Sequence, residues 1–121
     1  MCIRDSYLPL ATLEAALGGL AASAAPGSVL VTDYYARGFL DHPWGKAVAD
    51  YAAQRGEPMS ADSALDPATA ADFYARCGWR VTADLDASGI REKILVPRRR
   101  SHEPIVPFVH FVSAERAEVG R

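Results

Sequence analysis

The chain has 121 residues, half of them hydrophobic, and its 13 basic and 15 acidic side chains give a formal charge of -2. This length suits one small domain or part of a larger one, and the near-neutral charge argues against a general nucleic-acid binder, which would cluster Lys and Arg. No long apolar run and no signal-like start occurs, so we expect a cytoplasmic protein without a membrane span. Cys2 and Cys77 lack zinc-site spacing, so we expect free thiols and no metal site.

Residues 1–6, MCIRDS, differ in composition from the Ala- and Arg-rich remainder. The codons ATG-TGT-ATA-AGA-GAC-AGN encode this hexapeptide and match the end sequence that transposase-based sequencing libraries add to DNA fragments. We interpret residues 1–6 as an adapter artefact and exclude them from fold reasoning. The alternative is a genuine short N-terminus. On the adapter interpretation, the biological chain continues upstream of Tyr7.

Apolar periodicity predicts a helix followed by a strand in the first third of the chain. Residues 9–25 place Leu10, Leu13, Leu17 and Leu20 on one helix face, and the Pro-Gly pair at 26–27 ends this helix. Residues 28–32 form a nearly continuous apolar run, which is typical of a strand buried on both faces in a parallel sheet. Asp33, Tyr34 and Tyr35 would then follow the strand at its carboxyl end, where open α/β sheets bind ligands.

Two further helices are predicted in the middle of the chain. Residues 43–54 place Trp44, Val48 and Tyr51 on one stripe. The Asp-Pro pair at 66–67 is typical of a helix start, and the helix predicted from it ends at Gly78.

The last third of the chain predicts two strands. Residues 79–84 read as one strand, residues 85–93 are ambiguous and can hold a short helix, and residues 98–100 form a basic loop. Residues 107–115 alternate between two largely apolar sides, which predicts a covered strand, and residues 117–121 form a polar tail. His110 lies within this strand, where a packed or hydrogen-bonded core histidine is expected.

Three strands with helices between them predict an α/β layer, but a covered three-stranded sheet leaves an edge that should meet another strand. The chain contains no GxGxxG, GxGxG or GxxxxGKS loop of the kind that binds a nucleotide or cofactor. We therefore expect an incomplete domain.

Several motifs together resemble a known family. They are YLP at 7–9 before the first helix, PGS at 26–28 before a strand that ends in Asp33 and Tyr34, GEP at 56–58, DP at 66–67 with GW at 78–79, and the stretches at 91–97 and 107–111. In this order and spacing they resemble the C-terminal half of leucine carboxyl methyltransferase-like class I S-adenosylmethionine-dependent methyltransferases.

The resemblance covers residues 7–116 and implies the C-terminal part of a doubly wound Rossmann-like sheet. Residues 28–32, 79–84 and 108–113 would be its strands five, six and antiparallel seven. It also implies transfer of a methyl group from S-adenosylmethionine to a hydroxyl or carboxyl oxygen of a small molecule. The Gly-rich cofactor loop and the acidic ribose-binding position would lie upstream of Tyr7, so we expect this fragment to be inactive by itself.

The strand-end position and the resemblance together give six candidate substrate-binding residues: Tyr7, Asp33, Tyr34, Tyr35, His42 and Trp44. Tyr7 would also contact the cofactor at the edge of its cleft, unless it only packs at the helix start. His42 is a candidate acid/base, although a surface histidine beside Pro43 is the simpler interpretation. No catalytic residue is assigned, because methyl transfer depends mainly on alignment of donor and acceptor.

Two alternatives remain open. The chain could be a complete small α/β module that binds a partner or dimerises through its sheet edge. It could also be part of another doubly wound enzyme, such as a nicotinamide-dependent reductase.

Overall fold

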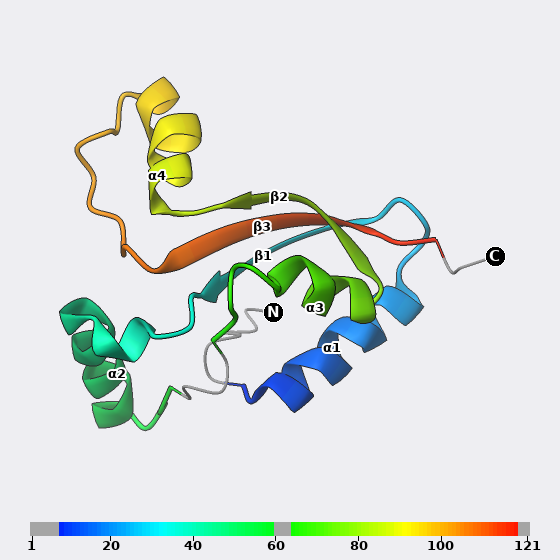
Figure 1. The fold of residues 1–121 in the computed structure, drawn as a ribbon, viewed down its shortest axis with the longest axis horizontal. Helices are drawn as coiled ribbons and strands as arrows, with labels where there is room; N and C mark the ends of the chain where they lie inside the picture. Colours follow the sequence, from blue (N-terminus) through cyan, green and yellow to red (C-terminus); the bar gives the residue numbers. More distant parts are fainter. Residues whose placement is uncertain (1–7, 60–63, 119–121) are drawn as a thin grey trace.

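The computed structural model describes residues 8–59 and 64–118, which form an α/β fold around a three-stranded sheet (Figure 1). The strands are β1 (Val29–Tyr35), β2 (Trp79–Leu85) and β3 (Val109–Arg116), in the order β1-β3-β2. β3 lies in the centre and is antiparallel to both neighbours, so β1 and β2 run in the same direction. The expected α/β class and the antiparallel last strand are confirmed.

Helices α1 (Leu10–Ser23) and α3 (Ala70–Arg76) pack against the same face of the sheet, below it in Figure 1. The buried side of α1 consists of Leu13, Leu17 and Ala21, whereas Leu20, expected on that side, is 44% exposed. The buried residues follow a spacing of four along α1, which leaves Leu20 at the margin of the stripe.

The opposite face of the sheet is open along much of β1. Val29 is 61% exposed and Val31 is 76% exposed, and Phe111 on the neighbouring strand is 39% exposed. The prediction of a strand over residues 28–32, buried on both faces in a parallel sheet, is therefore wrong, because β1 pairs antiparallel with β3 and reaches Tyr35. The expectation that the last strand is covered on both sides likewise fails at Phe111.

Helix α3 begins later than its sequence signal. The carboxylate of Asp66 accepts a hydrogen bond from the backbone amide of Ala68 at 3.0 Å, and this contact shapes a turn ahead of the helix, which begins only at Ala70. Asp66 therefore caps a turn rather than the helix itself. Cys77, directly after α3, is buried with a free thiol, as expected.

Helix α2 (Pro43–Gln54) has the predicted bounds but not the predicted buried face. Trp44 is 46% exposed and Tyr51 is 58% exposed, while Gly45 and Ala52 are buried. Gly45 lies directly against η2 (Phe39–Asp41), where an added Cβ would come within 1.7 Å of the carbonyl oxygen of Phe39. The helix thus packs through its smallest residues, because only they allow this close approach.

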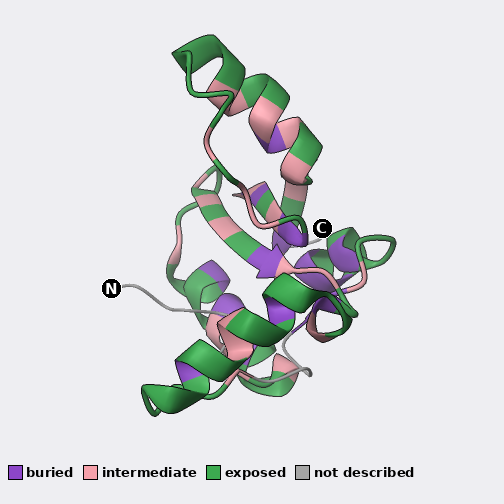
Figure 2. Cartoon of the chain, turned by 90° about the vertical axis from the view of Figure 1, so that its left-hand side faces the viewer, coloured by how far each residue is buried: buried purple, intermediate pink, exposed green. Residues whose placement is uncertain are grey.

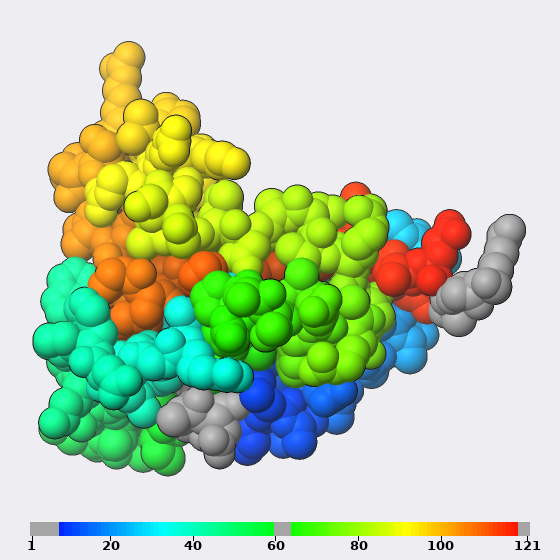
Figure 3. Space-filling view, viewed as in Figure 1, coloured from blue at the N-terminus to red at the C-terminus, as the bar shows by residue number. Residues whose placement is uncertain are grey.

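The ambiguous stretch after β2 is helical. It consists of α4 (Ala87–Ile90), the π-helical turn η4 (Arg91–Leu95) and the 3-10 turn η5 (Val96–Arg98). These turns form a lobe above the sheet, yellow in Figure 3, whose residues are exposed or half-buried except for the buried Ile90 (Figure 2).

Arginines of the lobe and of the predicted basic loop make hydrogen bonds that stabilise this part of the chain. Arg91 donates to the carbonyl oxygens of Ser101 and Glu103, and Arg98 donates to that of Ile94 at 3.0 Å. The guanidinium of Arg100 lies 2.7 Å from the Glu103 carboxylate. The guanidinium groups of Arg91, Arg98 and Arg100 are therefore engaged in contacts within this segment.

Candidate functional site

The carboxyl ends of β1 and β2 lie beside the start of β3, and this end of the sheet holds most of the candidate residues. Asp33, Tyr34 and Tyr35 lie at the carboxyl end of β1, as predicted, but they belong to the strand, which therefore extends beyond the predicted range 28–32. Side chains alternate along a strand. Asp33 and Tyr35 therefore lie on the open face with the α4 lobe, and Tyr34 lies on the face covered by α1 and α3.

On the open face, a pocket of about 340 Å³ lies between the sheet and the α4 lobe. Residues of β1 and β3, of the lobe and of the segment 103–106 line it. The lining residues are Asp33, Tyr35, Ile90, Ile94, Leu95, Glu103, Pro104, Ile105, Val106, Val109 and Phe111. Two of the six candidate residues, Asp33 and Tyr35, thus share an apolar pocket of a size that suits a small-molecule group.

The two carboxylates of this pocket differ in their surroundings. Desolvation by neighbouring protein atoms raises the pKa of Asp33, although the residue remains exposed to solvent. A hydrogen bond from Arg100 lowers the pKa of Glu103, so this carboxylate is already paired. Asp33 is the carboxylate better placed to accept a hydrogen bond from a ligand.

On the other face, three side chains from three adjacent strands form a hydrogen-bonded cluster. The hydroxyl of Tyr34 donates to Oδ2 of Asp84 at 2.7 Å, and Nδ1 of His110 lies 2.7 Å from Oδ1 of the same carboxylate. The Tyr34 hydroxyl also lies 3.1 Å from Nδ1 of His110. The rings of Tyr34 and His110 stack, with centroids 4.8 Å apart and planes at 19°.

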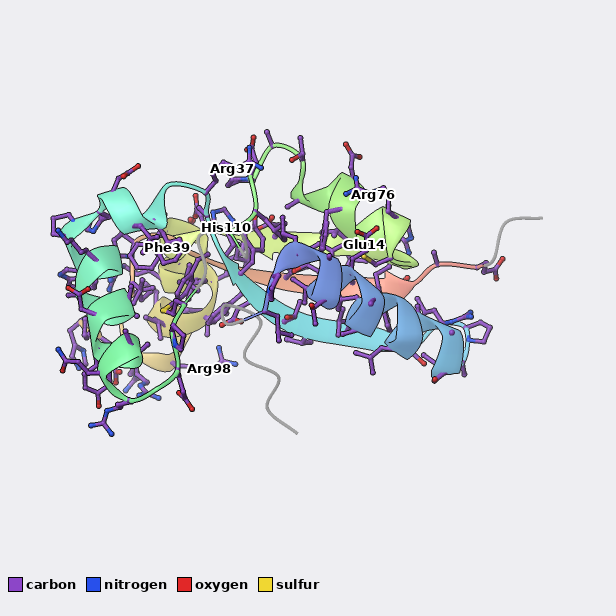
Figure 4. All side chains as sticks on the ribbon, turned by 90° about the horizontal axis from the view of Figure 1, so that it is seen from below. Glu14, Arg37, Phe39, Arg76, Arg98 and His110 are labelled. Atoms are coloured by element: carbon purple, nitrogen blue, oxygen red, sulfur yellow. The ribbon has the colours of Figure 1, made fainter. Side chains whose placement is uncertain are left out.

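This Tyr34–Asp84–His110 cluster is partly buried. The side chain of His110 is 15% exposed and that of Asp84 is 26% exposed. Burial, followed by the hydrogen bond to Asp84, raises the pKa of Tyr34 well above its ordinary value. Tyr34 therefore remains a protonated phenol that donates to Asp84. Figure 4 labels His110 at the end of the sheet nearer to α2.

The other candidate residues lie apart from the cluster. His42 caps α2, because its Nδ1 accepts a hydrogen bond from the backbone amide of Trp44 at 3.1 Å, and this gives it a structural role. Trp44 is exposed on α2. Tyr35 packs by its ring against Phe39 and Phe108, with centroid distances of 5.2 and 5.0 Å. Tyr7 and residues 1–6 lie outside the described residues.

Sequence reasoning missed Asp84 as a site residue. Asp84 is the penultimate residue of β2, where alternation along the strand turns it toward Val112 and the covered face. A carboxylate near the carboxyl end of a strand is the signal that could have identified it. His110 was expected to be a packed or hydrogen-bonded core histidine. The structure shows that its hydrogen-bond partners are the side chains of Tyr34 and Asp84.

A second hollow, of about 460 Å³, lies at the opposite end of the sheet beside Cys77 and Arg116. It contains none of the candidate residues. Within residues 8–59 and 64–118, no group of three or more His, Cys, Asp or Glu side chains is arranged to hold a metal ion. Among the same residues, no helix has both the length and the apolar character needed to cross a membrane.

No protein-family model, no curated protein and no solved structure matches this chain. The chemistry at the carboxyl end of the sheet is therefore the basis for assigning a function.

Proposed function

We propose that residues 7–116 are the C-terminal half of a leucine carboxyl methyltransferase-like, S-adenosylmethionine-dependent methyltransferase, which methylates a hydroxyl or carboxyl oxygen of a small molecule. The observation that carries the proposal is the apolar pocket at the carboxyl end of β1, which Asp33 and Tyr35 both line. A doubly wound sheet binds ligands at this position. In the parent enzyme, this pocket and the residues beside it form the acceptor side of the cleft.

The shape of the sheet supports a larger parent domain. In the part of the chain that the structure describes, β1 pairs along its length with β3 alone. Its other edge meets only the isolated bridge between Ala36 and Leu65, where the amide of Leu65 donates to the carbonyl oxygen of Tyr35 at 3.1 Å. The exposed side chains of Val29 and Val31 lie beside this edge, and doubly wound sheets cover both faces with helices. An upstream segment with further strands and helices would cover both the edge and this face. The antiparallel direction of β3 agrees with the seventh strand that the resemblance implies.

The described residues do not make a complete site for S-adenosylmethionine. A doubly wound sheet typically holds an adenosine cofactor with a Gly-rich strand-to-helix turn and an acidic ribose ligand. After β1 the chain instead runs through Ala36 and Arg37 to a single glycine, Gly38, at the start of η2. Residues upstream of Tyr7 would therefore hold most of the cofactor.

The part that this chain would play is to orient the acceptor and exclude water. The apolar lining residues Ile90, Ile94 and Phe111 suit the body of a small organic acceptor, and the Asp33 carboxylate can accept a hydrogen bond from its donor group. Holding the acceptor oxygen in line with the methyl donor accounts for much of the rate in a direct transfer.

Resequencing the source locus without transposase-based library preparation is the first test. We expect the reading frame to continue upstream of Tyr7 and to encode a Gly-rich loop. The extended protein should then bind S-adenosylmethionine in calorimetry and transfer a tritiated methyl group to a panel of hydroxyl and carboxyl acceptors. A stop codon directly upstream of a genuine Met1 codon would overturn the proposal and favour the small dimerising module.

A pair of matched variants tests the pocket in the extended protein. Asp33→Asn should raise KM for the acceptor at least about tenfold, because the amide removes the charge that fixes the donor group. Asp50→Asn, on the exposed side of α2, should leave KM unchanged. Equal effects of the two substitutions would exclude Asp33 from acceptor binding.

A further inference from the structure

The pocket between the sheet and the α4 lobe is acidic as well as apolar. Asp33 and Glu103 are the charged residues among those that line it, and none of its described lining residues is a lysine, an arginine or a histidine. Arg100 pairs with the carboxylate of Glu103, and Arg91 donates to the carbonyl oxygen of the same residue at 3.1 Å, but neither arginine lines the pocket. The charge of Glu103 is therefore offset within the chain.

The carboxylate of Asp33 has no cationic partner of this kind. None of the ion pairs among the described residues involves Asp33, whose carboxylate accepts a hydrogen bond from its own backbone amide. Neighbouring protein atoms remove part of its hydration and thereby raise its pKa. A partly desolvated carboxylate without a cation beside it is destabilised, and a positively charged ligand group would offset that loss of hydration.

The strand register places an aromatic ring next to this carboxylate. Asp33 and Phe111 are direct partners across β1 and β3, so their side chains are neighbours on the open face of the sheet. Both line the pocket, and Phe111 is 39% exposed, so its ring is accessible to a ligand. Because the face of an aromatic ring attracts a cation, Asp33 and Phe111 together suit a positively charged group.

We propose that this pocket binds an organic ammonium ion, so that the methyl acceptor is a small hydroxyl compound that also carries a protonated amine. Asp33 binds the ammonium group, and the aliphatic side chains of Ile90 and Ile94 contact the carbon skeleton. The inference rests on the proposed function and narrows its acceptor class. A ligand with a carboxylate in place of the ammonium group would meet the like charge of Asp33 and no cation among the described lining residues.

Three small phenols test the ligand class in the chain by itself. Tyramine, tyrosol and para-hydroxyphenylacetate share one body and end in an ammonium, a hydroxyl and a carboxylate group at neutral pH. NMR titration of the ¹⁵N-labelled chain gives a Kd for each compound from the amide signals of Asp33 and Phe111. We expect tyramine to bind at least about tenfold more tightly than tyrosol, and para-hydroxyphenylacetate to bind more weakly than either. Tighter or equal binding of tyrosol or of the carboxylate, or no binding of tyramine, would overturn the proposal.

Substitutions at Asp33 separate the effect of charge from that of shape. Asp33→Asn removes the charge, so the Kd values of tyramine and tyrosol should come within about twofold of each other. Asp33→Glu keeps the charge and should retain the preference for tyramine, and Asp50→Asn on α2 should leave all three Kd values unchanged. The amide spectrum of each variant reports whether it is folded. A preference for tyramine that survives in folded Asp33→Asn would show that another group binds the ammonium ion, and would overturn the role of Asp33.

The extended enzyme tests the same preference during turnover. The kcat/KM for tyramine should exceed that for tyrosol at least about tenfold and mainly through KM, because the ammonium group is bound alike in the ground state and the transition state. A higher kcat/KM for para-hydroxyphenylacetate would overturn the inference. If the extended enzyme transfers a methyl group to no hydroxyl or carboxyl acceptor, the proposed function fails, whereas the Kd values measured in the chain by itself still decide the ligand class.

Discussion

At the scale of single residues, the two tryptophans of the chain have opposite environments. Trp79 is 3% exposed, and its Nε1–H donates to the carbonyl oxygen of Leu17 at 2.9 Å, which ties β2 to α1. Trp79→Phe removes this hydrogen bond and part of the packed volume, so we expect a loss of about 1–3 kcal/mol in the free energy of unfolding.

Urea denaturation followed by circular dichroism measures this loss. Trp44→Phe is the control, because Trp44 is 46% exposed and its substitution should change the free energy of unfolding by no more than about 0.5 kcal/mol. Equal shifts in the two variants would mean that the contact between Trp79 and Leu17 contributes nothing to stability.

Asp33 makes the stability depend on pH. Desolvation raises its pKa in the folded chain above the ordinary value of 3.8, so the folded chain binds a proton more readily than the unfolded chain. The free energy of unfolding therefore falls as the pH rises from 3.8 through the folded-state pKa, and the exposure of Asp33 keeps this effect small.

Asp33→Asn should consequently raise the melting temperature at pH 7 relative to the unsubstituted chain, and this gain should vanish at pH 3, where the carboxyl is protonated in both states. Differential scanning fluorimetry at the two pH values compares them, with Asp50→Asn as a control for surface charge. A gain of the same size at pH 3 would exclude desolvation of Asp33 as its cause.

At the scale of elements, the contact between α2 and η2 depends on Gly45. A methyl group at this position would lie 1.7 Å from the carbonyl oxygen of Phe39, so Gly45→Ala must displace the helix and should cost at least about 1–3 kcal/mol. Gly19→Ala, in an open position of α1, should instead stabilise the chain by up to about 1 kcal/mol. Thermal unfolding measures both variants, and shifts in the same direction would contradict this close packing.

At the scale of the whole molecule, the open sheet face and the edge of β1, which is paired only near Leu65, should make the isolated chain marginally stable and prone to self-association. Val31→Lys places a charge on this face and should reduce self-association in sedimentation velocity experiments. Leu20→Lys, which adds the same charge on α1, should not. A chain that is strictly monomeric and unfolds sharply at high temperature would argue against a larger parent domain.

The local elements could be predicted from sequence because their signals are local. Proline and glycine positions place α1 and α2, and the apolar alternation around Val112 places β3. Asp33 and Tyr35 were predicted as site residues from their position near a strand end, and they line one pocket. The start of α3 was missed because the turn at Asp66 carries the same residues as a helix cap.

The sequence by itself determined the α/β class and the order of helices and strands, because periodicity and turn residues act within a few positions of the chain. Only the tertiary structure decided which face of β1 is open, and it alone placed Tyr34, Asp84 and His110 together. These three residues lie on different strands, and pairing between strands sets which side chains meet. The distance between these residues along the sequence does not predict the register in which their strands pair, so the cluster is seen only in the folded sheet.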